Sequence, residues 1–144
     1  MSRRTHLLFA GLVLYWYIQL MGLQPKVEWM VSCLTASLFP DLDYYLRRLP
    51  LIEHRKTLHN LWVLAITSIL LISYEIWLPW ALGYATHLFL DSTTRAGVDI
   101  LLVGKRIRGP LRTGGLFDRI LFFLMLSYAA FLITRNLTGI KFYL

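Results

Sequence analysis

Charged residues are scarce in this chain: they make up 16% of its 144 residues, against about a quarter in an ordinary soluble domain. Hydrophobic residues make up 57%. This balance excludes a typical soluble globular domain and indicates an integral membrane protein. Cysteine is also nearly missing, and the single Cys33 excludes an internal disulfide.

Acidic residues are few as well, so the formal net charge is +7. Nucleic-acid binding is one explanation of such a charge. In a membrane protein, however, Lys and Arg accumulate in cytoplasmic loops, and we favour that explanation. We therefore expect membrane lipid as a partner and no nucleic acid.

Long apolar runs are present and have lengths typical of full or short membrane spans: 6–23, 27–39, 60–78, 80–94 and 116–134. Between the second and third runs, the segment 41–60 has no long apolar stretch and carries Tyr44 and Tyr45 among its charges. It is typical of a juxtamembrane amphipathic helix. We predict one all-α membrane domain over 1–144, with about five transmembrane helices and this segment.

The basic residues predict how these spans are oriented. If the five spans alternate across the membrane, all but three of the fifteen Lys and Arg residues fall on one side; the exceptions are Lys26, Arg135 and Lys141. The positive-inside rule makes that side cytoplasmic. We therefore expect a multi-pass protein of the cell (inner) membrane, with its N-terminus in the cytoplasm and its C-terminus outside.

Polar islands interrupt the apolar sequence, and they hold all four histidines and three nearby aspartates: His6, His54, His59, His87, Asp41, Asp43 and Asp91. Such residues are costly to place in hydrocarbon and are retained there for a use. The span count, which used none of them, places all seven at the cytoplasmic boundary. Imidazoles and carboxylates together form a ligand set for divalent metal ions, so we predict all seven as metal ligands.

Some of these residues have a structural alternative. His87 and Asp91 are four apart, so they share one helix face and could bind one ion, or simply hydrogen-bond neighbouring helices. Asp41 and Asp43 diverge on a helix but converge on a cation if the backbone turns; otherwise they cap a helix or face solvent.

The pair His54 and His59 also has two explanations. On a continuous helix the two side chains would lie roughly 140° apart, so the pair suits a loop or a helix start. Alternatively, this basic stretch contacts anionic lipid headgroups, which explains Arg55 and Lys56 but not the histidines. No serine lies in a nucleophile elbow, so Ser-His-Asp catalysis fits poorly.

Several separated motifs occur in order: Thr5-His6 with Gly11, Leu38-Phe39-Pro40-Asp41-Leu42-Asp43, His54-Arg55 with His59, Gly83 with His87 and Asp91, then Thr94 and Gly97-Val98. Together they resemble the prokaryotic YdjM-like membrane-bound metal-dependent hydrolases. The second block of that family reads like His-Arg-Gly-x-Thr-His-Ser. In this chain Lys56, Leu58 and Asn60 replace its glycine, threonine and serine.

The order of these ligand-like residues is also similar to zinc-dependent phospholipase C and P1 nuclease, helical proteins whose clustered zinc ions cleave phosphodiesters. This chain lacks the later histidine and glutamate of their third metal position, so we expect one or two ions.

The resemblance implies a metal-dependent hydrolase. We expect zinc to activate water against a phosphoester, phosphodiester or lipid headgroup at the cytoplasmic boundary. One of Asp41 and Asp43 would bind metal, the other would take a proton, and Arg55 would hold a phosphate. The alternative is a non-enzymatic protein that binds or transports metal ions.

Overall fold

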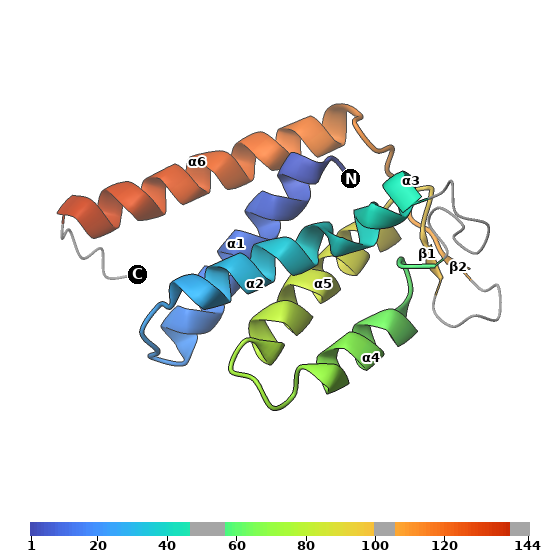
Figure 1. Ribbon diagram of the computed structural model, residues 1–144. Helices are drawn as coiled ribbons and strands as arrows, with labels where there is room; N and C mark the ends of the chain where they lie inside the picture. The colour runs from blue at the N-terminus through green and yellow to red at the C-terminus, as the bar shows by residue number, and fades with distance from the viewer. Residues whose placement is uncertain (47–56, 100–105, 139–144) are drawn as a thin grey trace.

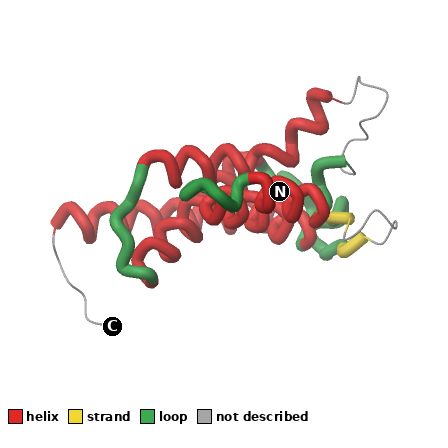
Figure 2. Tube along the Cα trace, turned by 60° about the horizontal axis from the view of Figure 1, so that its bottom comes forward, coloured by secondary structure: helices red, strands yellow, loops and turns green. Residues whose placement is uncertain are grey.

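The computed structural model describes residues 1–46, 57–99 and 106–138. Its elements follow one another in the order α1 (Arg3–Leu20), α2 (Val27–Leu38), η1 (Phe39–Asp41), α3 (Leu42–Leu46), α4 (Leu61–Leu70), α5 (Trp77–Ser92), β1 (Val98–Asp99), β2 (Arg106–Ile107) and α6 (Leu116–Thr138). Figures 1 and 2 show a helical bundle with the two short strands at one end. The described residues thus confirm the all-α prediction, with one small hairpin added.

The helices α1, α2 and α5 form the core, and the contact between α2 and α5 is the most extensive. Gly83 of α5 permits this contact, because a Cβ atom there would lie 2.0 Å from the carbonyl oxygen of Cys33 on α2. Small residues allow such close approach of helix backbones in membrane proteins. Beside this contact, Ala36 and Tyr84 are fully buried. The spacing of α2 and α5 positions the last turns of α5, which carry His87 and Asp91.

α6 lies along the outside of the bundle, where it packs against α1 (Figure 1). Of the described helices, it alone is both long enough and apolar enough to cross a membrane. Only 17% of its most apolar stretch is buried, so it is not the core helix of a soluble domain. The predicted span 116–134 is therefore supported, although the helix continues to Thr138.

The prediction of five transmembrane helices is not supported by the described residues. α4 has ten residues and ends at Leu70, whereas the sequence predicted a span over 60–78. Polar Ser73 and Glu75 lie in the turn that follows, and Glu75 forms an ion pair with Lys26, just before the start of α2. α1 has 18 residues, but its first turn is polar, and α2 and α5 are shorter still.

Pro40 ends α2 as the sequence predicts, and its ring falls in the one-turn η1. α3 follows at once and exposes Leu42, Tyr44 and Tyr45, as an interfacial helix would. The predicted amphipathic segment 41–60 is therefore helical at its start; its residues 47–56 lie outside the described part of the chain.

After α5, the strands β1 and β2 pair antiparallel. Arg106 on β2 holds Asp99 on β1 through two nitrogen–oxygen contacts of 2.8 and 3.3 Å. Asn60, just before α4, forms a β-bridge with the same Asp99. The hairpin thereby fixes the chain next to His59.

Candidate metal centre

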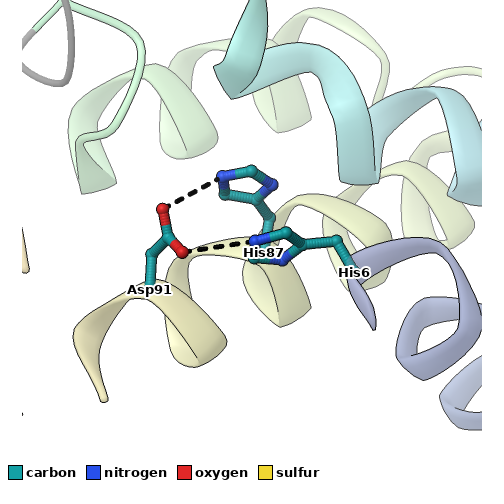
Figure 3. A group of neighbouring side chains, drawn as sticks. All are labelled: His6, His87 and Asp91. Atoms are coloured by element: carbon teal, nitrogen blue, oxygen red, sulfur yellow. Dashed lines mark ion pairs between the residues drawn. The ribbon is translucent and has the colours of Figure 1, made fainter. Parts of the chain in front are cut away.

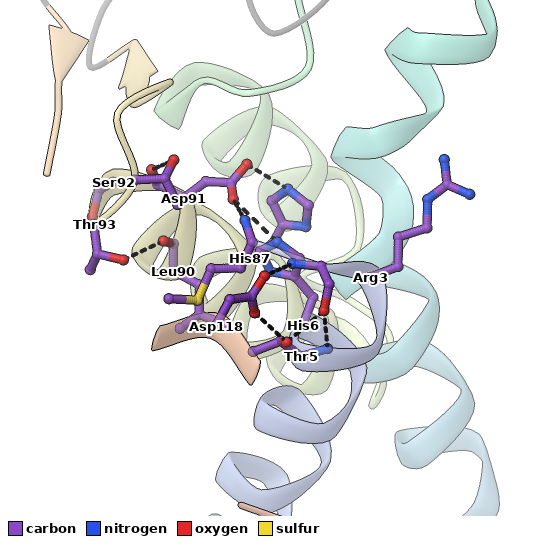
Figure 4. A network of polar contacts seen from close by, with 12 residues as sticks. Arg3, Thr5, His6, His87, Leu90, Asp91, Ser92, Thr93 and Asp118 are labelled. Carbon is purple, nitrogen blue, oxygen red and sulfur yellow. Dashed lines mark hydrogen bonds and ion pairs between the residues drawn. The ribbon is translucent and has the colours of Figure 1, made fainter. Parts of the chain in front are cut away.

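His6 enters the site from the first turns of α1. The side chain of Ser2 caps this helix by accepting a hydrogen bond from the backbone N–H of Thr5. Asp118 of α6 then accepts from the backbone N–H of Ser2 at 2.9 Å and from the Thr5 hydroxyl at 2.6 Å (Figure 4). With the start of α1 held in this way, the His6 side chain is directed inward and is 1% exposed.

His87 and Asp91 lie on one face of α5, as their spacing predicts (Figure 3). The Nδ1 atom of His87 is 2.7 Å from the backbone carbonyl oxygen of Ser37 on α2. A carbonyl only accepts, so Nδ1 carries the hydrogen and Nε2 of His87 is left as a lone-pair donor. This arrangement fixes both the tautomer and the ring orientation, as is usual for histidines that bind metal.

His59 precedes α4, where the Asn60 side chain caps the helix by accepting from the backbone N–H of Trp62. The Nδ1 atom of His59 lies 3.0 Å from Oδ2 of Asp43, a fully buried carboxylate on α3. Asp43 therefore orients His59 in the way that Ser37 orients His87, and the Nε2 atoms of both rings face the same point.

The nitrogen and oxygen atoms that meet inside the cluster have the spacing of metal ligands. Nε2 of His59 is 3.2 Å from Nε2 of His87, and Oδ2 of Asp91 is 3.5 Å from the first and 3.6 Å from the second. With zinc–ligand distances of about 2.0 Å, two ligands of a tetrahedral ion lie about 3.3 Å apart. These three atoms therefore match one face of a zinc tetrahedron.

Two further donors border this triangle. Nε2 of His6 is 3.2 Å from Oδ1 of Asp91, and Oδ1 of Asp41 is 3.8 Å from Nε2 of His59. The described residues thus contain two overlapping groups that could hold an ion, one of His6, His87 and Asp91, the other of Asp41, His59 and His87. Because His87 has a single free nitrogen, it can ligate only one ion at a time. Two ions would need Asp91 as a bridge, and its two oxygens do face different histidines (Figure 3).

The cluster is buried on all sides but one. His6, His59 and His87 are at most 1% exposed, and Asp91 is 3% exposed, whereas a quarter of the Asp41 side chain is exposed. Asp41 is therefore the most solvent-accessible of the five described candidate ligands. Buried polar groups need partners, and Nδ1 of His6 has no hydrogen-bond partner among the described residues.

His59 has a shifted protonation equilibrium in the absence of metal. Burial disfavours the imidazolium, but the hydrogen bonds to Asp43 and Asp91 outweigh this cost and raise the pKa of His59 to about 9. The site is therefore rich in negative charge and favours a cation, either a proton or a metal ion.

The chain matches, over residues 1–142, the model of the protein family described as "YdjM inner membrane protein". It belongs to the YdjM family. The family name agrees with α6 as a helix able to span a membrane, so the protein is assigned to the inner membrane. Neither curated proteins nor solved structures gave a match. The multi-pass arrangement and the orientation of the termini stay predictions.

The structure of this YdjM family member brings five of the predicted ligands together: His6, Asp41, His59, His87 and Asp91. Asp43, predicted as a ligand or proton acceptor, belongs to neither candidate group and contacts the outer nitrogen of His59. Two predicted residues, His54 and Arg55, lie outside the described part of the chain.

Sequence reasoning missed the positively charged neighbours of the cluster. The Nε atom of Arg3 lies 3.6 Å from Oδ2 of Asp41, and its guanidinium also donates to the Tyr45 hydroxyl at 2.8 Å. The Met1 amino group forms an ion pair with Asp91. In the sequence, Arg3 supported only the orientation of the first span. Its position two residues before Thr5-His6 is the feature that could have predicted a place near the cluster.

Two departures from the YdjM family pattern are accommodated by the fold. Asn60, which replaces a serine, caps α4 as serine would. Leu58, which replaces a threonine, contributes its backbone carbonyl, which accepts a hydrogen bond from the hydroxyl of buried Tyr84. Lys56 lies outside the described residues.

Proposed function

We propose that this protein is a membrane-bound, metal-dependent hydrolase of the zinc type. The observation that carries the proposal is the triangle of His59 Nε2, His87 Nε2 and Asp91 Oδ2, whose edges of 3.2–3.6 Å fit tetrahedral zinc. Two imidazoles and a carboxylate leave one coordination position open, as in catalytic rather than structural zinc sites.

A bound zinc ion would lower the pKa of a coordinated water and polarise a phosphoryl or carbonyl oxygen. The residues of the chain would perform the remaining tasks. Asp43 and the carbonyl of Ser37 keep the two histidines in the required tautomer. Asp41, partly exposed and 3.8 Å from His59, is placed to take a proton from an attacking water.

The substrate we propose is a phosphoester or phosphodiester, and in particular a lipid headgroup. Arg3 beside Asp41 supports this choice, because its half-exposed guanidinium can hold a phosphate with two hydrogen bonds. Leu42 and Tyr45 follow Asp41 closely in the chain and expose their side chains, which supports a position of the cluster at the membrane surface. Arg55 remains a further candidate for phosphate binding.

Metal analysis of purified protein, with an assay of phosphodiester hydrolysis in lipid vesicles, tests this proposal. Wild-type protein should contain about one ion per chain or two, and should release headgroup phosphate. Asp91→Asn should lose both. Glu75→Gln, which changes a carboxylate paired with Lys26 outside the cluster, should keep both.

The two assays separate the candidate functions. Metal binding without hydrolysis of any phosphoester or carboxylic ester would favour the non-enzymatic metal-binding or transport protein. If wild-type protein that is prepared without chelator and in the presence of zinc contains no metal, both the hydrolase and the metal-binding protein are refuted.

A further inference from the structure

A second concentration of positive charge lies outside the metal cluster. A pocket of about 590 Å³ opens between the beginning of α1 and the beginning of α6. Three arginines line it, Arg3, Arg4 and Arg119, next to the rings of Phe122 and Phe123. Arg4 and Arg119 are exposed, and neither forms an ion pair with a described residue. Two guanidinium groups are therefore available to an anion.

The one acidic residue in this lining, Asp118, is already occupied. It is 2% exposed and accepts hydrogen bonds from Ser2, Thr5 and the backbone N–H of Gly114. It holds α1 against α6 and does not reach out to neutralise the arginines. The pocket therefore keeps an excess of positive charge.

An apolar groove follows the pocket along the same two helices. It measures about 290 Å³ and is lined mainly by aliphatic side chains, among them Leu7 and Leu8 of α1 and Leu132 and Ile133 of α6. α1 and α6 run in the same direction, so the charged pocket lies at their beginnings and the groove lies farther along both. We call the pocket and the groove together the α1–α6 seam.

We propose that the α1–α6 seam binds an anionic phospholipid from the bilayer. The phosphate would contact Arg4 and Arg119, and an acyl chain would pass Phe122 and Phe123 into the apolar groove. Basic pockets beside membrane helices bind anionic headgroups in this way. A free phosphate would use the arginines alone, whereas the apolar part of the seam and the exposed Phe123 match a lipid.

Lipid retention by the full-length protein tests this proposal. Chelator-treated protein is placed in nanodiscs that contain phosphatidylglycerol and phosphatidylcholine, and retained lipid is measured by native mass spectrometry after release. Wild-type protein should retain phosphatidylglycerol in preference. The double variant Arg4→Gln, Arg119→Gln should lose this preference by about tenfold or more. Arg135→Gln, at the other end of α6, is the matched control and should retain it.

Several outcomes would overturn the proposal. They are equal retention of the two lipids by wild-type protein, an equal loss in Arg135→Gln, or displacement of the lipid by millimolar inorganic phosphate. Because both arginines are exposed, the variants should fold, and an unchanged melting temperature verifies this. The measurement uses metal-free protein and no substrate turnover, so its result is independent of the proposed hydrolase activity.

Discussion

At the residue scale, His59 and His87 each direct Nε2 into the cluster, while the Nδ1 atom of each ring contacts a neighbouring oxygen outside it. Ser37 holds His87 and Asp43 holds His59, whereas Nδ1 of His6 is buried without a hydrogen-bond partner in the described part of the chain. His6 therefore lacks the second contact that fixes the tautomer of the other two histidines. The fixed pair, His59 and His87, should dominate metal affinity.

Asp43→Asn tests the holding role directly. The amide keeps the size of the carboxylate but loses its charge, so His59 is held less firmly and is a weaker base. We expect metal affinity to fall by about 10- to 100-fold, as for other residues that orient metal-binding histidines. Competition titration with a zinc indicator measures this fall, and Glu75→Gln should show none. An unchanged affinity in Asp43→Asn would contradict the assignment.

The raised pKa of His59 predicts how the stability of chelator-treated protein depends on pH. The folded pKa is about 9 and the unfolded pKa about 6.5, so this stabilisation is fully present below the unfolded value. It is lost as the pH rises through the folded value. The thermal midpoint in detergent should therefore fall from about pH 6.5 to about pH 9.

His59→Gln provides the comparison for this pH dependence, because it removes the titrating group. Its thermal midpoint should change less over the same pH range than that of the wild type. Parallel curves for the two proteins would show that His59 is not the source.

The sequence predicted the five residues that meet in the cluster, together with Asp43 and His54, but not what each one does. His87 and Asp91 were predictable because helical spacing alone puts them on one face. The role of Asp43 was not, because it depends on α3 turning away from Asp41 after η1, and a spacing of two residues does not determine the backbone there. The partner of His87 is a backbone carbonyl, which no side-chain pattern reveals.

At the element scale, the positions of the helices followed from apolar runs, but their ends depended on tertiary contacts. Pro40 ended α2 where expected, since proline acts locally. The run 60–78 is divided, since α4 ends at Leu70 and α5 begins at Trp77; Glu75 in the turn between them forms an ion pair with Lys26, just before α2. The strands β1 and β2 have two residues each and are joined by the contacts of Arg106 with Asp99, so the sequence contains no alternating apolar pattern that would predict them.

Gly83→Ala tests the contact between α2 and α5. The added methyl group would meet the Cys33 carbonyl oxygen at 2.0 Å, so α5 must move away from α2. We expect a loss of about 1–3 kcal/mol in unfolding free energy, together with weaker metal binding. Chemical denaturation and zinc titration measure the two effects.

Gly11→Ala is the control for this substitution. A Cβ atom at Gly11 would meet only Leu34 Cδ2, at 4.0 Å, which is ordinary van der Waals contact. Gly11→Ala should therefore be neutral or slightly stabilising. A similar loss in both variants would mean that the close contact with Cys33 does not explain the effect of Gly83→Ala.

At the scale of the whole molecule, α6 stands apart from the three-helix core and supplies no ligand to the cluster. It is the described helix that could span a membrane, and it is joined to α1 through Asp118. The sequence predicted α6 well because a lipid-facing helix is defined by composition alone, with little dependence on its neighbours.

Leu126→Arg tests whether α6 anchors the protein. Leu126 is exposed near the middle of α6, where a charge costs about 2.5–3.5 kcal/mol for membrane insertion. A larger fraction of this variant should be released from membranes by alkaline extraction. Leu137→Arg, in the last turn of the same helix, should be retained, because a terminal arginine can reach the interface. Full retention of both variants would show that other segments provide the anchor.

The contact of Asp118 with Ser2 and Thr5 joins α1, the first of the described helices, to α6, the last of them. His6 leaves the ribosome long before Asp91, and Asp118 follows both. A nascent chain can therefore gather its metal-binding side chains only after α5 has emerged, and it can fasten them only after α6 has begun. Under the proposed function, the metal ion would be loaded only after α5 has been made, which would place metal loading late in biogenesis.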